Sequence, residues 1–218
     1  THDYILFLSN RGRAYRLKCY EIPESSRTAR GVNVINLLPL EPEEKITSMI
    51  RVEEFSDDHY LCMVTKNGVI KRTALSAYNT ARKGGVIAIV LDEGDDLAWV
   101  RLTEGDCDVF VATRNGMIIR FNEQDARPLS RTARGVKAIS LEDGDEVIGM
   151  ARNREGACLL TVTTKGQGRR TPVEDYRTQT VVTAANGYAG LADPVAIIKQ
   201  CFTRSMRKRK NILVDRFP

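Results

Sequence analysis

The amino-acid sequence predicts an all-β fold, an array of about four propeller-type blades with about 50 residues and four strands in each. Three observations support this prediction. The heptapeptide Ser26–Val32 recurs letter for letter at Ser130–Val136, 104 residues later, and a looser relative, Asn79–Val86, lies close to halfway between them. Short glycine turns recur at intervals of 56, 48 and 50 residues, at Gly12, Gly68, Gly116 and Gly166. No stretch of the chain shows a sustained helical period.

Each repeat is expected to open with a β-hairpin. In the first repeat, Tyr4–Ser9 and Ala14–Leu17 are rich in β-formers and flank the turn at Gly12. Val34–Leu38 and Lys45–Val52 are then expected to supply the last two strands of the unit. The first repeat therefore predicts four strands in about 50 residues, which is the size of one blade.

The second and third repeats restate this order. Their hairpins are expected at Tyr60–Val64 with Val69–Arg72, and at Val109–Ala112 with Met117–Phe121. A further strand is expected at Ile87–Leu91. Acidic turns follow at Asp92–Asp96 and Glu142–Glu146; they lack the alternating ligand spacing of a calcium loop and are interpreted as solvated tips.

The fourth repeat is incomplete. It begins with Cys158–Val162, but the pattern stops after Gln179. We place the repeats at residues 1–55, 56–104, 105–153 and 154–179, and assign 180–218 to a divergent basic tail that is partly helical or disordered. A helix is expected over Pro194–Met206.

The placement of charge predicts a polyanionic partner. The 218 residues include 33 Lys and Arg against 28 Asp and Glu, a mild excess of +5. The basic residues of the repeated loops have no acid among them, and equal positions in a repeat array project along one surface. These loop cations are Arg27, Arg30, Arg82, Lys83, Arg131 and Arg134.

Enzymatic and metal-dependent functions find no support in the composition. The five cysteines fall singly, and the two histidines are isolated, so neither a disulfide framework nor a metal site is expected. No arrangement of Ser, His and Asp for nucleophilic catalysis is present, and no cofactor is expected. No signal peptide or membrane-length apolar run is found, and we expect a cytoplasmic protein with no membrane partner.

The loop sequences resemble the C-terminal domain of the DNA gyrase A subunit. The resemblance rests on Tyr20–Glu24 before Ser26–Gly31, on Arg82–Gly85, on Arg127 and Pro128 before the second heptapeptide, and on Gly168–Pro172, and it extends from Thr1 to about Gln179. It implies a β-pinwheel, in which neighbouring four-stranded blades exchange a strand. It also implies a non-catalytic module of a type II topoisomerase, since the cleavage residues of that protein lie in its other parts.

The same resemblance implies a function. Members of the family wrap double-stranded DNA around a basic outer rim without sequence specificity, which supports ATP-dependent negative supercoiling. The implied partners are duplex DNA, the rest of the gyrase A subunit and, through it, the gyrase B subunit, in the nucleoid. The candidate DNA contacts then also include Arg72, Arg169 and Arg170.

Two departures from the family pattern bear on wrapping. The hallmark Gln-Arg-Arg-Gly-Gly-Lys-Gly loop is absent, and the tail replaces the similar run expected after Gln179. We therefore expect the isolated chain to bind DNA but to introduce little writhe. Two other interpretations stay open, the equivalent C-terminal domain of topoisomerase IV and a propeller-like scaffold that binds an acidic protein. The blades could close into a ring or leave an open arc.

Overall fold

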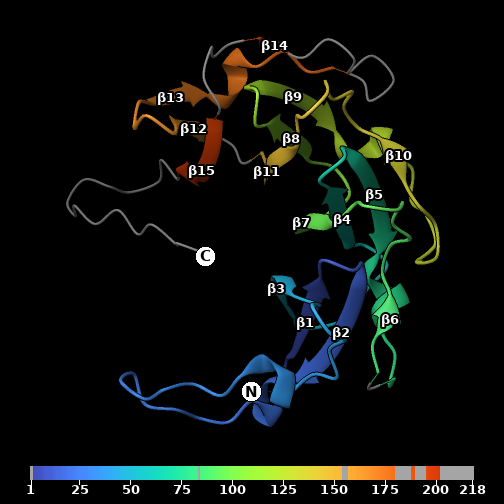
Figure 1. Cartoon of the computed structure of the whole chain (residues 1–218). Coiled ribbons are helices and arrows are strands. Elements are labelled where there is room, and N and C mark those ends of the chain that lie inside the picture. The colour runs from blue at the N-terminus through green and yellow to red at the C-terminus, as the bar shows by residue number, and fades with distance from the viewer. Residues whose placement is uncertain (1, 83, 154–156, 180–187, 190–194, 202–218) are drawn as a thin grey trace.

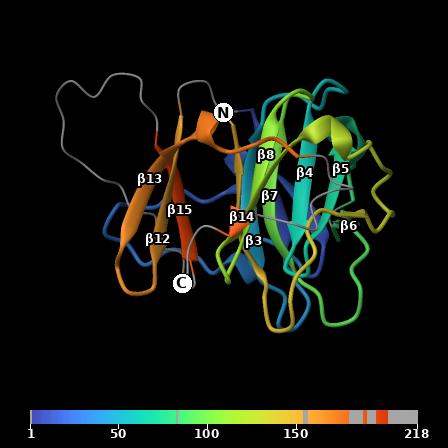
Figure 2. The ribbon, with the colours of Figure 1, turned by 90° about the horizontal axis from the view of Figure 1, so that it is seen from above.

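Four antiparallel sheets follow one another round an arc in the computed structural model of the chain (Figure 1). The structure describes residues 2–82, 84–153 and 157–179, together with the backbone of 188–189 and 195–201. Seen from above, the strands of successive sheets run roughly alongside one another (Figure 2). The prediction of an all-β array of blades is confirmed.

The first sheet shows that a blade is assembled from two repeats. The hairpin strands β1 (Tyr4–Ser9) and β2 (Arg13–Lys18) lie in its middle. On the inner side β3 (Ile46–Val52) pairs with β1, whereas the outer edge of β2 is covered by β6 (Val86–Ile87) from the second repeat. This pairing is the strand exchange that the family resemblance implied, and it is confirmed.

The second and third sheets repeat this order. In each, an inner strand, a hairpin and a two-residue exchange strand from farther along the chain follow one another from the inside of the arc outward (Figure 1). The second sheet contains β7 (Leu97–Thr103), β4 (Tyr60–Thr65), β5 (Val69–Ala74) and β10 (Val136–Lys137). The third contains β11 (Val147–Arg152), β8 (Asp108–Thr113), β9 (Met117–Asn122) and β14 (Tyr188–Ala189).

The fourth sheet has three strands among the described residues, in the order β13 (Gly168–Pro172), β12 (Cys158–Thr163) and β15 (Val195–Cys201). The helix expected over Pro194–Met206 is therefore wrong at Val195–Cys201. This segment is rich in β-branched residues and finds an open edge on β12, so it completes the inner side of the blade as a strand. The rest of the expected helix lies outside the described residues.

Two predicted strands also differ from the structure. Val34–Leu38 has no strand partner, and a 3₁₀ turn forms at η2 (Val34–Asn36), where the Asn33 side chain accepts a hydrogen bond from the Ile35 amide. Ile87–Leu91 contributes only Ile87 to β6, because the next two amides both donate to the Gly12 carbonyl instead of continuing a ladder. The remaining 3₁₀ turns are η1 (Cys19–Glu21), η3 (Leu75–Tyr78), η4 (Glu123–Asp125) and η5 (Val173–Asp175).

The hydrophobic core lies between neighbouring sheets. Leu8 of the first blade packs with Leu61 and Met63 of the second, and all three are essentially fully buried. Val64 of the second blade packs in the same way with Val109 and Val111 of the third. Since these two clusters each join neighbouring blades, the first three blades form one continuous packed array. A smaller cluster around Phe7, Tyr15 and Leu38 lies within the first repeat.

Candidate nucleic-acid interface

The repeated basic loop Ser130–Val136 lies on the outer edge of the second blade, one blade before its own repeat. Strand β10 pairs with β5, and the Leu129 amide donates to the Arg72 carbonyl. Beneath the loop, the fully buried Lys71 donates from Nζ to the carbonyls of Ala88 and Arg131, at 2.7 and 2.5 Å. Burial, reinforced by the charge of Arg131, lowers the pKa of Lys71 to about 8. The loop is thus held on the rim by its backbone.

The loop that contains Arg82 is placed in the same way on the first blade. Strand β6 pairs with β2, Arg13 Nη2 donates to the Gly84 carbonyl at 2.9 Å, and Arg16 Nη1 donates to Asn79 Oδ1 at 2.8 Å. Both loops therefore leave the outer side of successive blades, away from the inner strands (Figure 1). This is the geometry that the repeat spacing predicted.

The loop glycines serve packing. Gly135 has φ +113°, and a Cβ there would lie 2.6 Å from the Ile70 carbonyl oxygen. A Cβ on Gly85 would lie 2.6 Å from the Tyr15 ring. These glycines allow the exchange strand to sit against the preceding blade, and the arginines before them reach outward.

Most of the predicted loop cations are exposed. Arg27, Arg30, Arg82 and Arg134 lie at the surface, and Arg131 is half-buried. Arg134 forms an ion pair of 2.6 Å with Asp92, but both side chains stay well exposed, so the guanidinium remains accessible. Arg169 and Arg170 are exposed on β13, the outermost described strand of the fourth sheet. Lys83 lies outside the described residues.

Arg72 is a correction to the predicted contacts. Its side chain is 7% exposed, stacks over the Tyr60 ring and lies 3.7 Å from the fully buried Glu123 carboxylate. It also donates to the Gly105 carbonyl. An arginine enclosed in this way joins the second blade to the third and cannot offer its guanidinium to a phosphate.

Arginines equivalent to Arg72 recur four residues after each turn glycine. Arg120 in the third blade pairs with Asp108 and donates to the carbonyls of Val173 and Tyr176 in the fourth repeat. Arg16 holds Asn79 of the second repeat. This inter-blade function was not predicted, although the constant offset of these arginines from the turn glycines was a signal for it in the sequence.

The structure adds two cations to the candidate interface. Arg16 and Lys18 lie over the Tyr4 ring, with Lys18 Nζ 3.5 Å from the ring centroid. With Arg82 they line a hollow of about 530 Å³ on the first blade, whose lining also includes Glu21. Hydrogen bonding to Lys18, followed by the charges of Lys18 and Arg16, lowers the pKa of Tyr4. This hollow places three cations and an aromatic face together.

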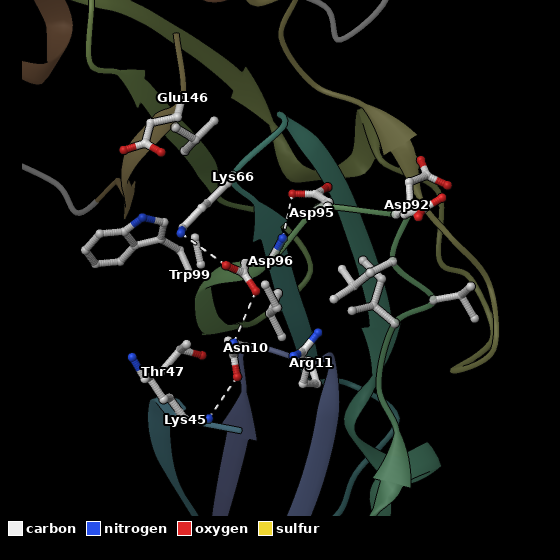
Figure 3. Close-up of a pocket in the computed structure, with 18 of the residues that line it drawn as sticks. Asn10, Arg11, Lys45, Thr47, Lys66, Asp92, Asp95, Asp96, Trp99 and Glu146 are labelled. Carbon is white, nitrogen blue, oxygen red and sulfur yellow. Dashed lines mark hydrogen bonds and ion pairs between the residues drawn. The ribbon is translucent and has the colours of Figure 1, made fainter. Parts of the chain in front are cut away.

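The acidic turns accept hydrogen bonds from the turns of the hairpins. Asp95 Oδ1 accepts from the Asn67 amide at 3.0 Å, and Asp145 Oδ1 accepts from the Asn115 amide at 2.9 Å, at equivalent positions of two repeats. Asp96 contacts Lys66 and Asn10, which links the second blade to the first (Figure 3). Asp95 and Asp96 line a separate hollow and would repel phosphates from it.

Within the part of the chain that the structure describes, no cluster of three or more His, Cys, Asp or Glu residues is arranged to hold a metal ion. Of the described helices, none has the length and apolar character needed to span a membrane.

Comparison with known proteins identifies the family. A family model described as "DNA gyrase C-terminal domain, beta-propeller" matches residues 3–53, 59–104, 108–154 and 159–180, which correspond to the four repeats. The chain belongs to the DNA gyrase C-terminal domain family. The DNA gyrase A subunit of Staphylococcus aureus (strain NCTC 8325 / PS 47) is 48% identical to it over 180 residues, which are 81% of this chain and 20% of the relative. The chain thus spans one fifth of the length of this component of a type II topoisomerase.

Solved structures of the family share the fold. The C-terminal domain of DNA topoisomerase IV superposes with a TM-score of 0.81 at 24% identity, covering 93% of this chain and 64% of that one. The DNA gyrase A C-terminal domain superposes with a TM-score of 0.74 at 26% identity, covering 94% of this chain and 67% of that one. The β-pinwheel prediction is confirmed by these matches and by the strand exchange.

Proposed function

We propose that this chain is a non-catalytic module of the DNA gyrase A subunit that binds duplex DNA along its outer rim without reading the base sequence. The observation that supports this most directly is the placement of exposed arginines on loops at the outer side of successive blades. In the complete enzyme the module wraps DNA at the nucleoid and so supports ATP-dependent negative supercoiling, together with the rest of the A subunit and, through it, the B subunit.

The chemistry of the rim suits the phosphate backbone. Arginine presents a planar fork that matches phosphate oxygens, and contacts to phosphate fix a protein on the duplex without carrying sequence information. The contacts we assign to the second-blade rim are Arg131 and Arg134, and those of the first-blade rim are Arg82 with Arg16 and Lys18. Arg72 is excluded because it is buried.

Binding is tested through its salt dependence. Each phosphate neutralised contributes about −0.9 to the slope of log affinity against log salt. Changing Arg131 and Arg134 together to Ala should therefore flatten the slope by about two units. The matched control changes Arg11 and Lys45, two cations that line the acidic hollow, and should leave the slope as it was. Equal effects of the two double variants would refute the assignment of the rim.

Wrapping is a separate part of the proposal. Bending a site of about 20–30 base pairs costs about 1–6 kcal/mol, which contacts along the whole rim must offset. The four blades described here are expected to hold DNA with little writhe by themselves. The test is to bind the chain to nicked plasmid, ligate, remove the protein and count topoisomers. A linking-number shift as large as an intact gyrase A C-terminal domain gives would contradict this expectation.

The scaffold alternative makes a different prediction for DNA length. Affinity of a DNA-binding rim should rise with the length of random-sequence duplex until the arc is filled. A scaffold for an acidic protein should show no such gain. Gel shifts with duplexes of graded length separate the two functions.

A further inference from the structure

We propose that Lys71 is a positioning residue for DNA binding, because its buried ammonium group holds the loop 130–136 where Arg131 and Arg134 are presented on the second-blade rim. The effect on DNA binding rests on the proposed function, whereas the position of the loop can be measured without DNA. Lys71 lies on β5 and is 0% exposed. Since its side chain cannot reach a phosphate, it can affect DNA binding only through the residues that it holds.

Two segments from different blades meet at this ammonium group. Lys71 Nζ donates to the Arg131 carbonyl at 2.5 Å and to the Ala88 carbonyl, just after β6, at 2.7 Å. Two residues farther along both segments, the Val90 amide donates to the Ala133 carbonyl at 3.2 Å. Strand β6 covers the first blade and β10 covers the second. The ammonium group therefore fixes the middle of the basic loop against the segment that leaves the first blade.

The neighbouring blades show that packing at this place does not need a charge. Lys71 stands three residues after its turn glycine, as do Tyr15 in the first blade and Ile119 in the third, and both are buried. Ile119 packs in the core with Ala138, which corresponds to Ala88 because each donates its amide to the carbonyl of a turn glycine. An aliphatic side chain thus fills the equivalent place. The charge of Lys71, which is costly to bury, is explained by the two carbonyls that it binds.

The surroundings of Lys71 make the strength of this hold depend on pH. Of the residues that the structure describes, none places a carboxylate within ion-pair distance of Lys71, and burial, with the charge of Arg131, lowers its pKa to about 8. The protonated fraction should therefore fall from about nine tenths at pH 7 to about one tenth at pH 9. Hydrogen bonds from a charged donor are about twice as strong as neutral ones. The loop should be held less firmly as the pH rises through 8.

Other charged and titratable groups lie on the segments packed around Lys71. The Tyr78 phenol donates to the same Ala88 carbonyl at 3.4 Å, and burial raises its pKa, so it keeps its proton between pH 7 and 9. Arginine stays charged over this range. The groups on these segments are Tyr78 of η3, Asp92 beyond Ala88, Arg131 and Arg134 on the loop, and Lys137 on β10.

The effect of Lys71 on stability has the opposite sign. Because burial lowers its pKa, the unfolded chain binds this proton more tightly than the folded chain does. Between about pH 8 and pH 10, the contribution of Lys71 to the free energy of unfolding should therefore rise with pH. A loss of DNA affinity over that range cannot then be attributed to unfolding caused by Lys71.

The first test follows the loop without DNA, by hydrogen–deuterium exchange of the full chain at pH 7. In Lys71→Ile, amides in 88–92 and 129–137 should exchange about tenfold faster or more, because the hydrogen bonds from a charged group are lost. Exchange in β4 should stay as in the parent, which shows that the second blade remains folded. Lys71→Met takes the place of Lys71→Ile if the latter does not fold, with the same results expected.

The second test is the salt dependence of DNA binding. Lys71→Ile should flatten the slope of log affinity against log salt by up to about two units, as the double change of Arg131 and Arg134 to Ala does. Adding Lys71→Ile to that double variant should flatten the slope no further, because Lys71 acts through these arginines. Lys45→Ile is the matched control. It removes the same charge from an exposed residue beside the acidic hollow and should leave slope and exchange unchanged.

The third test repeats the salt titration at pH 9. The slope of the parent should then approach that of Lys71→Ile, whose own slope should change less between the two pH values. Parallel pH profiles, a triple variant flatter than the double variant, or unchanged loop exchange in Lys71→Ile would each overturn the positioning role. If the loop loosens in Lys71→Ile but the double variant keeps the slope of the parent, Lys71 still holds the loop and the proposed function of the rim is wrong.

Discussion

Replacing Gly135 by Ala should detach the second-blade basic loop from the rim. A Cβ at this position would lie 2.6 Å from the Ile70 carbonyl oxygen and 2.9 Å from Val69 Cγ1, and both contacts are too close to be tolerated. The backbone has φ +113°, a region that costs a residue other than glycine about 1–3 kcal/mol. Movement of the loop would also break the pairing of β10 with β5.

The strain and the lost backbone hydrogen bonds together should lower the free energy of unfolding by about 2–4 kcal/mol. For a chain of this length that loss corresponds to a fall in Tm of about 4–16 °C. Urea titration followed by fluorescence can measure it, because Trp99 is the single tryptophan and packs against the core between the second and third blades. The Cm should fall while the change in fluorescence on unfolding stays the same.

Gly31→Ala is the control for this prediction. It makes the same substitution in the same heptapeptide, but no atom lies within 4 Å of the added Cβ and Gly31 is not in the positive-φ region. Its stability should stay within about 0.5 kcal/mol of the parent. If both variants lost the same stability, or if Gly135→Ala lost none, the role assigned to the docked glycine would be refuted.

Three further outcomes are expected. Arg72→Met should lower the free energy of unfolding by about 3 kcal/mol in urea titration, because it leaves the buried Glu123 without its cation. It should not alter the slope of log DNA affinity against log salt. A flattened slope would show that Arg72 contacts DNA. Gly116→Val should lower Tm, since this turn residue has φ +89°, while the folded fraction keeps its DNA affinity within a few-fold in gel shifts. Normal stability with lost DNA binding would show that Gly116 serves binding and not folding. Burial and the hydrogen bond to Glu44 raise the pKa of Tyr15, so the unfolded chain loses the phenolic proton at a lower pH than the folded chain does. The free energy of unfolding should therefore fall above about pH 10, and it should fall less steeply in Tyr15→Phe. Parallel pH profiles of stability in the two proteins would contradict this role of Tyr15.

The local parts of the fold could be predicted from the sequence. Hairpins flanking Gly68 and Gly116 follow from β-rich runs on either side of a turn, and both form where expected. The repeat also predicted the placement of the loops that contain Arg82 and Arg131, which lie on the outer edges of successive blades. The first heptapeptide, Ser26–Val32, pairs with none of the described strands. These inferences need only short-range information, because turn chemistry and strand propensity act between residues close together in the chain.

The errors arose where a residue's surroundings come from another repeat. Arg72 looked like one more loop cation, but its partner Glu123 lies in the third repeat, and nothing near Arg72 in the chain announces its burial. The prediction of a strand at Val34–Leu38 was wrong because a strand needs the edge of another strand to pair with. Val195–Cys201 became a strand because β12 offered such an edge. Pairing between distant segments is a property of the assembled array, which local patterns do not contain.

The exchange of strands also sets a schedule for synthesis. The hairpin of the first blade is complete when Lys18 emerges from the ribosome, but the strand that covers its outer edge begins at Val86, 68 residues later. At about 5–20 residues per second this interval lasts about 3–14 s. During it the nascent blade exposes an unpaired edge beside other growing chains, and the second and third blades, covered by β10 and β14, pass through similar delays. The speed of translation, which the folded molecule does not record, therefore governs how long each edge can capture the wrong strand.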